Sequence, residues 1–574
     1  MLFRRSPLTV LLLAITGAAS AQIHPFSSDG GMVVSDSKIA SDVGAKILDQ
    51  GGNAVDAAIA TGFALAVTHP EAGNIGGGGF MVVRMANGEK LAIDFREMAP
   101  AAASRDMYLD ENGDVVPRRS TVGRLAAGVP GAVAGYWEAH KKYGTMEWSD
   151  LLEPAVRLAA EGYVLTENRA RIYRNRQSSF RQFPETFRTF NRSGNPYKEG
   201  DVFVQADLAK TLERIRDNGR DGFYAGETAR LLEADAKKNG GLFTEEDLAN
   251  YKAVLREPLV GSYRGHEVIS MPPPSSGGIA LLQMLGMLER FDLSEFEPES
   301  APYIHLVVET MKRAFADRAE HLGDPDFSPV PVKSLLNGSY LAGLARGINP
   351  DKATPSSEIS ALKVSPQEGE NTTHYSVVDQ DGNAVSTTTT LNTSFGALVI
   401  PEGLGFFLNN EMDDFTSKPG VPNTYGLIQG EANSIAPGKR PLSSMTPTIV
   451  VKDGQTLLVT GSPGGPTIIN TVMHSILNVV DHRMTVQQAV SVPRFHHQWL
   501  PDRIRWERFG ISLETRTRLQ ELGHALEDNP RQMGSCHAIL IEAATGKRRA
   551  GVDPRLRDSG AAASALRGAE RVAR

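Results

Sequence analysis

The chain of 574 residues contains a single cysteine, Cys536. It therefore cannot form an intramolecular disulfide or a cysteine-cluster zinc site, and its stability must come from its core. The formal net charge is -7, so the chain has no basic surplus that would attract nucleic acid or an anionic membrane. A buried, unreactive thiol is the ordinary interpretation of Cys536, and a nucleophile is the alternative.

Long apolar runs are also scarce. The first 21 residues combine two arginines, an apolar run from Leu8 to Ala18 and an Ala-Ser-Ala site that ends at Ala21, which is typical of a cleavable export signal. The run is short for a bilayer span of about 20 residues. We expect a periplasmic or secreted protein that starts near Gln22 and has no stable membrane span.

Two further patterns lack what a cofactor site needs. The run Gly76–Gly79 has no following Lys-Ser/Thr, so it does not predict a phosphate loop, and close backbone packing near a pocket is the better interpretation. His496 and His497 are adjacent, so they do not share a face of a helix or strand, and no carboxylate stands at a usual ligand spacing. We expect no metal and no cofactor.

The amino-terminal half begins with helices and a hairpin. Apolar periodicity predicts helices over 37–50 and 54–67. Strands over 81–86 and 89–95 flank Asn87-Gly88, a strong hairpin signal, which places Arg96 at a strand end. A chain of this length predicts one large or two-part globule.

The join at Asn371-Thr372 carries the main functional signal. Strands over 373–378 and 384–391 surround a turn, and pairing of Val378 with Ala384 places Thr372 opposite Thr390. A threonine that begins a chain carries its own base, the α-amine, whereas an internal threonine has none. Thr372 could therefore act as a nucleophile after the bond before it is cut. The alternative is an ordinary strand opening, since threonine favours strands.

A second hairpin, over 448–452 and 455–460, leads into a glycine turn and a helix over 467–480. Backbone N–H groups of Gly464 and Gly465 at this helix entrance could bind an oxyanion. From these residues alone, a plain tight turn remains the alternative.

Several motifs together resemble the γ-glutamyltranspeptidase family of N-terminal nucleophile hydrolases. The resemblance spans the chain from Gly51-Gly52-Asn53-Ala54-Val55-Asp56 to Pro493-Arg494-Phe495-His496-His497-Gln498. The motifs between these ends, in family order, are Thr372-Thr373-His374-Tyr375-Ser376-Val377-Val378-Asp379, Leu391-Asn392, Asn409-Asn410-Glu411-Met412-Asp413-Asp414-Phe415, Pro441-Leu442-Ser443-Ser444-Met445 and Gly461-Ser462-Pro463-Gly464-Gly465.

The resemblance implies an α+β fold, a four-layer αββα sandwich with two stacked antiparallel sheets flanked by helices. It also implies self-cleavage at Asn371-Thr372 into a large subunit, 22–371, and a small subunit, 372–574. These subunits would form a heterodimer around one interleaved core.

The resemblance further assigns roles to individual residues. Thr372 looks like the nucleophile, Thr390 like its support, and Gly464 and Gly465 like the oxyanion donors. An amino-acid head group needs a cationic donor at one end and carboxylates at the other. The residues for the α-carboxylate are Arg96, Ser443 and Ser444; those for the α-ammonium are Asn392, Glu411 and Asp414. Taken alone, Arg96 and Asp414 would be ordinary surface charges. The stretch 420–440, with Tyr425, resembles a lid loop, and a passive surface loop is the alternative.

The implied activity is that of a γ-glutamyltransferase and glutathione hydrolase. Its donor would be glutathione or a related γ-glutamyl amide, and its acceptor would be water, an amino acid or a dipeptide. One alternative is an acylase of the same fold that acts on glutaryl side chains of β-lactams and needs no ammonium site. The other is an inactive periplasmic binding protein, which would not be cut at Thr372.

Overall fold

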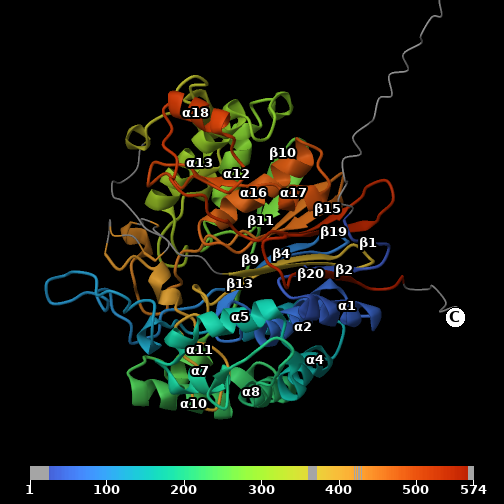
Figure 1. The fold of residues 1–574 in the computed structure, drawn as a ribbon, viewed down its shortest axis with the longest axis vertical. Helices are drawn as coiled ribbons and strands as arrows, with labels where there is room; N and C mark the ends of the chain where they lie inside the picture. Colours follow the sequence, from blue (N-terminus) through green and yellow to red (C-terminus); the bar gives the residue numbers. More distant parts are fainter. Residues whose placement is uncertain are drawn as a thin grey trace, which may run out of the picture.

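The structure is a computed structural model that describes residues 25–359, 372–418, 421, 423–424, 427 and 430–566. Two seven-stranded sheets are stacked at its centre, and every strand pairing within them is antiparallel. Helices cover the outer face of each sheet, as Figure 1 shows. The predicted α+β sandwich of four layers is confirmed.

Sheet 1 carries the hairpin that follows Thr372. Its strands, in spatial order, are β20 (Gly560–Ala563), β2 (Met32–Ser35), β12 (Thr373–Val378), β13 (Ala384–Thr390), β3 (Gly78–Arg84), β4 (Lys90–Phe95) and β9 (Val254–Arg256). Strands from before and after residue 371 both contribute to this order, and β2 lies between two strands from after it, so the two halves of the sequence build one sheet.

Sheet 2 mixes the two halves in the same way. Its strands, in spatial order, are β1 (Ser27–Ser28), β19 (Arg548–Val552), β18 (His537–Ile541), β15 (Gln455–Thr460), β14 (Thr448–Lys452), β11 (His266–Ser270) and β10 (Leu259–Tyr263). Short two-stranded ribbons lie outside both sheets: β5 (Tyr163–Val164) with β8 (Val202–Phe203), β6 (Asn191–Arg192) with β7 (Asn195–Pro196), and β16 (Phe495–His496) with β17 (Arg505–Trp506).

Apolar side chains fill the space between the sheets. Val34 and Phe80 from sheet 1 belong to the same buried cluster as Ile449 and Ile539 from sheet 2. Alternation along each strand produces this core, because successive side chains point to opposite faces.

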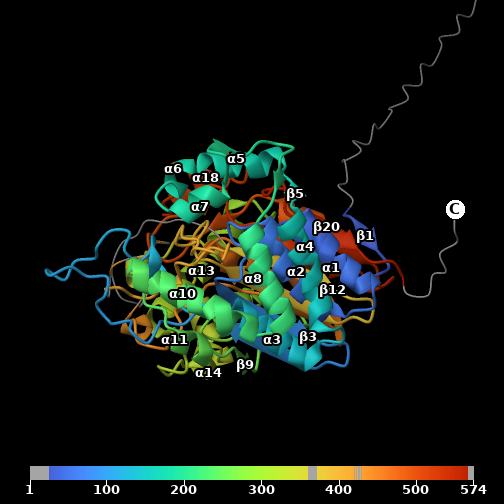
Figure 2. The ribbon, with the colours of Figure 1, turned by 90° about the horizontal axis from the view of Figure 1, so that it is seen from below.

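The helices below sheet 1 in Figure 1 include two that begin at clear caps. The Ser37 hydroxyl accepts a hydrogen bond from the Ala40 N–H, and Asn53 and Asp56 form a capping box. Figure 2 shows this layer from below. Its members are α1 (Lys38–Asp49), α2 (Ala54–Thr68), α3 (Ala132–Tyr143), α4 (Trp148–Glu161), α5 (Glu167–Asn175), α6 (Gln177–Phe180), α7 (Pro184–Thr189), α8 (Ala206–Asn218), α9 (Asp221–Tyr224), α10 (Gly226–Asn239) and α11 (Glu245–Asn250).

The helices above sheet 2 pack on its outer face through a second large apolar cluster. They are α12 (Gly277–Leu288), α13 (Ala301–His321), α14 (Val332–Leu335), α15 (Gly338–Arg346), α16 (Thr467–Val480), α17 (Val486–Ser491) and α18 (Leu513–Glu521). No helix in the described ranges is long and apolar enough to cross a membrane.

Candidate active site

Thr372 lies at the entrance of strand β12, opposite the last residue of β13. The register pairs Val378 with Ala384 and Thr373 with Thr389, as predicted. The hydroxyl oxygens of Thr372 and Thr390 are 3.5 Å apart. Hairpin pairing therefore brings two threonine hydroxyls together at the ends of two interior strands of sheet 1.

Close backbone packing holds the end of β13 in place. A Cβ added to Gly77 would lie 2.1 Å from the Thr390 carbonyl oxygen, and one added to Gly79 would lie 2.3 Å from that of Thr388. Only glycine fits between these backbones. The prediction that Gly76–Gly79 serves packing near the pocket is confirmed.

Asp36 is a buried acid that contacts the residues after Thr372, and its role was not predicted from the sequence. Asp36 accepts hydrogen bonds from the Thr373 hydroxyl (2.5 Å) and the His374 N–H (3.4 Å), and it pairs with His537. Burial opposes its charge, but His537, His69 and the Thr373 hydroxyl together lower the pKa of Asp36 to about 2. These contacts of Asp36 fix the residues that follow Thr372.

Arg96 lines the same pocket as Thr372 and is fully buried directly after β4. Its guanidinium donates to Glu411, to Asp414 Oδ2 (2.5 Å) and to the Leu442 carbonyl (3.2 Å). Burial disfavours its charge, but the carboxylates of Glu411, Asp414 and Glu97 outweigh this and raise the pKa of Arg96. Arg96 is thus a buried cation and not a surface charge.

The carboxyl groups around Arg96 crowd one another. Burial raises the pKa of Glu97 to about 7 and raises the pKa of Glu411 well above its usual range. The pKa of Asp414 also rises with burial, although Arg96 opposes the rise. This part of the pocket therefore has more acid than its one directly paired arginine balances, which suits an added cation.

The pocket collects nearly all the residues that the resemblance assigned. Its lining residues are Arg96, Arg318, Thr372, Thr390, Asn392, Glu411, Asp414, Leu427, Ser443, Ser444, Met445, Gly465 and Ile468. Arg318, from helix α13, was not predicted, because one arginine in the last turn of a long helix gives no sequence signal.

The glycine turn has free donors beside this pocket. Gly464 and Gly465 have φ angles of 129° and 52°, which favour glycine, and they precede the first turn of α16. Neither backbone N–H donates a hydrogen bond to another residue in the described part of the chain. Gly465 lines the pocket, so the turn presents unused donors on the Thr372 side.

The lid stretch is described only in part, and Tyr425 lies outside the described residues. Asn423 Nδ2 donates to Asp414 Oδ1 (3.1 Å), and the Thr424 N–H donates to Asp413 Oδ2 (2.9 Å). Leu427 lines the pocket. These contacts attach the stretch to the acidic end of the site.

Two groups outside the pocket, among the described residues, could suggest other chemistry. Cys536 is buried, and burial raises the pKa of its thiol, so it is poorly suited to attack. His305, Glu309 and His524 lie close enough to share an ion. However, Glu309 pairs with Arg313 at 2.7 Å, and the two histidine rings are hydrogen-bonded at 2.7 Å, so this cluster is already satisfied.

Comparison with known proteins agrees with this geometry. The family model "Gamma-glutamyltranspeptidase" matches residues 40–563. The chain belongs to the γ-glutamyltranspeptidase family. A curated relative from Escherichia coli (strain K12), glutathione hydrolase proenzyme, is 51% identical over 528 residues, which cover 92% of this chain and 90% of the relative. The family assignment made from the ordered motifs is confirmed.

Solved structures of similar proteins include two kinds of enzyme. The γ-glutamyltranspeptidase of Helicobacter pylori is 49% identical, with a TM-score of 0.56, and the match covers 58% of this chain and 96% of that one. A cephalosporin acylase from Bacillus halodurans is 27% identical, with a TM-score of 0.83, over 96% of this chain and 99% of that one. The fold is therefore shared by members that differ in substrate.

Proposed function

We propose that this member of the family is a self-cleaving precursor that becomes a γ-glutamyltransferase and glutathione hydrolase. The observation that supports this best is the pocket itself, which has paired threonine hydroxyls at one end and Arg96 with Glu411 and Asp414 at the other. A γ-glutamyl group has a reactive carbonyl and a zwitterionic head, and the two ends of the pocket match these two parts.

Maturation begins in the uncut chain, where Thr372 has no free amine. Its Oγ attacks the carbonyl carbon of Asn371, and the peptide bond shifts from nitrogen to oxygen to give an ester. Water then hydrolyses this ester, leaving a carboxylate on Asn371 and a free α-amine on Thr372. Thr390 Oγ accepts a hydrogen bond from the Asn392 N–H (2.7 Å), so its own proton can be donated toward Thr372 Oγ.

Turnover uses the new amine. With a pKa of roughly 7.7–8.0 in the unperturbed case, the α-amine accepts the Thr372 hydroxyl proton while Oγ attacks the γ-carbonyl. The N–H groups of Gly464 and Gly465 bind the oxyanion. The proton passes to the departing amine, leaving a γ-glutamyl ester on Thr372. Water releases glutamate from this ester, whereas an amino acid or dipeptide amine forms a new γ-glutamyl amide.

The head group binds at the charged end. Its α-carboxylate is held by Arg96 and by the serines Ser443 and Ser444, while its ammonium replaces part of the pairing between Arg96 and the carboxylates Glu411 and Asp414. Asn392 adds an amide oxygen on the ammonium side. Glutathione is the first donor to test, because it is a γ-glutamyl amide and carries this head group.

Two further expectations belong to the same proposal. The export signal predicts a periplasmic or secreted protein. The pieces 22–371 and 372–574 remain together as a heterodimer after cleavage. Strands from both pieces are hydrogen-bonded to one another in both sheets, which supports their association.

An acylase that removes glutaryl groups is the second candidate, and the TM-score of 0.83 with a cephalosporin acylase supports it. A glutaryl group has no ammonium, so Glu411 and Asp414 would stay paired with Arg96. Comparing γ-glutamyl anilide with glutaryl anilide on the same purified protein separates the two candidates, because only the transferase needs the ammonium.

The main test replaces the proposed nucleophile. Thr372→Ala should leave one uncut chain with no activity, since it removes the hydroxyl used in both steps. Intact mass and amino-terminal sequencing measure the cut, and release of aniline from γ-glutamyl anilide measures turnover. Two normal pieces from Thr372→Ala would rule out the proposed mechanism.

A further inference from the structure

A second arginine, Arg318, lines the pocket and is not directly ion-paired with any carboxylate in the described part of the chain. Arg318 lies in the last turn of α13, and only 2% of its surface is exposed. Within the described ranges, no carboxylate oxygen lies within 4.0 Å of its guanidinium nitrogens. Other buried arginines, such as Arg96 and Arg494, bond directly to carboxylates.

Its hydrogen bonds lead to the two serines at the carboxylate end. Nε donates to the Ser276 hydroxyl (2.8 Å), which in turn donates to the Ser443 carbonyl (2.6 Å). Nη2 donates to the Ser444 hydroxyl (3.2 Å). Arg318 is therefore connected to both residues that we place around the substrate carboxylate.

The hydrogen bond from Arg318 determines whether the Ser444 hydroxyl can donate a hydrogen bond into the pocket. An oxygen that accepts from a guanidinium has its lone pair occupied on that side, so its proton points elsewhere. In the described part of the chain, the Ser444 hydroxyl donates to no other group, and Ser444 lines the pocket. The proton is thus available to an anion in the pocket.

The positive charge of Arg318 also favours an anion in the pocket. Burial lowers the pKa of Arg318 to about 10, with Asp414 opposing the change, so the group is still protonated at neutral pH. An unpaired buried charge is costly unless something compensates it. Arg96 is paired directly with Glu411 and Asp414, whereas no carboxylate among the described residues lies within ion-pair distance of Arg318.

We propose that Arg318 is a positioning residue for the substrate carboxylate, which orients the Ser444 hydroxyl and supplies the positive charge that Arg96 shares with its carboxylates. This inference rests on the proposed function, since it concerns the same substrate. It predicts a role in binding and not in bond making, because Arg318 does not contact Thr372.

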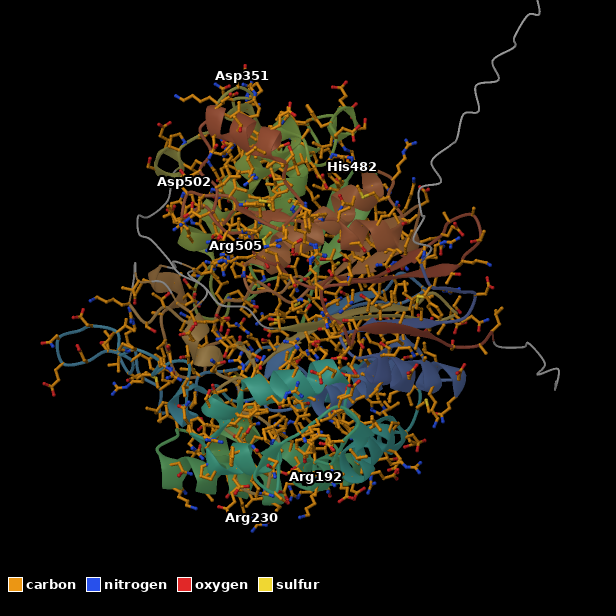
Figure 3. All side chains as sticks on the ribbon, in the orientation of Figure 1. Arg192, Arg230, Asp351, His482, Asp502 and Arg505 are labelled. Atoms are coloured by element: carbon orange, nitrogen blue, oxygen red, sulfur yellow. The ribbon has the colours of Figure 1, made fainter. Side chains whose placement is uncertain are left out.

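The experiment compares Arg318→Gln and Arg318→Lys with the unaltered protein. Arg318→Gln should raise KM for γ-glutamyl anilide by about tenfold to a hundredfold, the range expected for a lost hydrogen bond to a charged group, with kcat changed by less than about threefold. Arg318→Lys keeps the charge but cannot make both contacts, so its KM should be intermediate. Arg230→Gln, on the outer helix α10 (Figure 3), is the control and should leave KM unchanged.

Two readouts distinguish positioning from a general structural effect. Binding of L-glutamate as an inhibitor should weaken in Arg318→Gln, whereas binding of 4-aminobutyrate, which lacks the α-carboxylate, should not. Ser444→Ala and Arg318→Gln should also be non-additive, since one acts through the other. Equal weakening of both inhibitors, additive effects, or an unchanged KM in Arg318→Lys and Arg318→Gln would each overturn the inference. If the unaltered protein released no aniline from γ-glutamyl anilide, the proposed function would be overturned instead.

Discussion

Arg96 forms ion pairs with the acidic side chains around it in the pocket. The guanidinium contacts Glu411 and Asp414 directly and lies 3.5 Å from Glu97. A ligand with one carboxylate and one ammonium can enter this network without a change in total charge, because each of its charges replaces a partner already present. A ligand with only a carboxylate adds negative charge to a site that is already acidic.

Arg96→Ala should therefore destabilise the protein as well as impair binding. Removing one partner of a buried ion pair costs about 3 to 5 kcal/mol in the free energy of unfolding. Urea unfolding of Arg96→Ala in the uncut Thr372→Ala chain measures this cost. An otherwise unaltered Arg96→Ala protein should turn over γ-glutamyl anilide very poorly but still be cut at Thr372, since Arg96 lies at the other end of the pocket. Loss of the cut in a folded Arg96→Ala protein would show that Arg96 also serves maturation.

The hairpins are the elements that the sequence predicts best. The β14–β15 hairpin has the bounds expected from Asp453-Gly454 and the alternation beside it, and the β12–β13 register follows by counting from its turn. Both predictions depend on turn residues that lie next to the paired strands in the sequence. Long-range contacts have no such local signal: Arg318 and Ser444 are 126 residues apart, and Asp36 and His537 are 501 apart.

The close approach of Gly77 to the Thr390 carbonyl gives a prediction for the end of β13. Gly77→Ala should push the end of β13 away, because its Cβ would meet the Thr390 carbonyl at 2.1 Å. We expect cleavage at Thr372 to slow by at least about tenfold, since Thr390 would move from its partner. Gly338→Ala, at the start of α15, is the matched control, because its Cβ meets nothing within 4 Å. A time course of the two pieces on a denaturing gel measures the rate, and equal rates in both variants would contradict the prediction.

At the scale of the whole molecule, buried acids make stability depend on pH. Burial raises the pKa of Asp413 from 3.8 to about 6, so between these values the folded chain keeps a proton that the unfolded chain has released. Stability is therefore greatest at the acidic side of this window and falls as pH rises through about 6. Glu97, raised to about 7, acts in the same direction.

Asp413→Asn should remove part of this dependence. The shift of Asp413 corresponds to about 3 kcal/mol between pH 4 and 7, and the variant should lose that share of the slope. Urea unfolding of the uncut Thr372→Ala chain at several pH values measures it. Asp351→Asn, at the exposed surface (Figure 3), tests whether loss of any carboxylate has the same effect. An unchanged slope in Asp413→Asn would assign the pH dependence to other groups.

Both sheets combine strands from before and after residue 371, so we expect unfolding to become irreversible if the chain is cut there. Before the cut, one connected chain threads both sheets, and closing its loops costs little extra entropy. Afterwards, the same arrangement would have to be rebuilt by two separate polymers that meet at low concentration. The mature protein would then persist only because it unfolds slowly, so its lifetime would be set by a rate and not by an equilibrium. After unfolding by heat or denaturant, the two pieces would not refold together readily, because they lack the covalent connection that the precursor had.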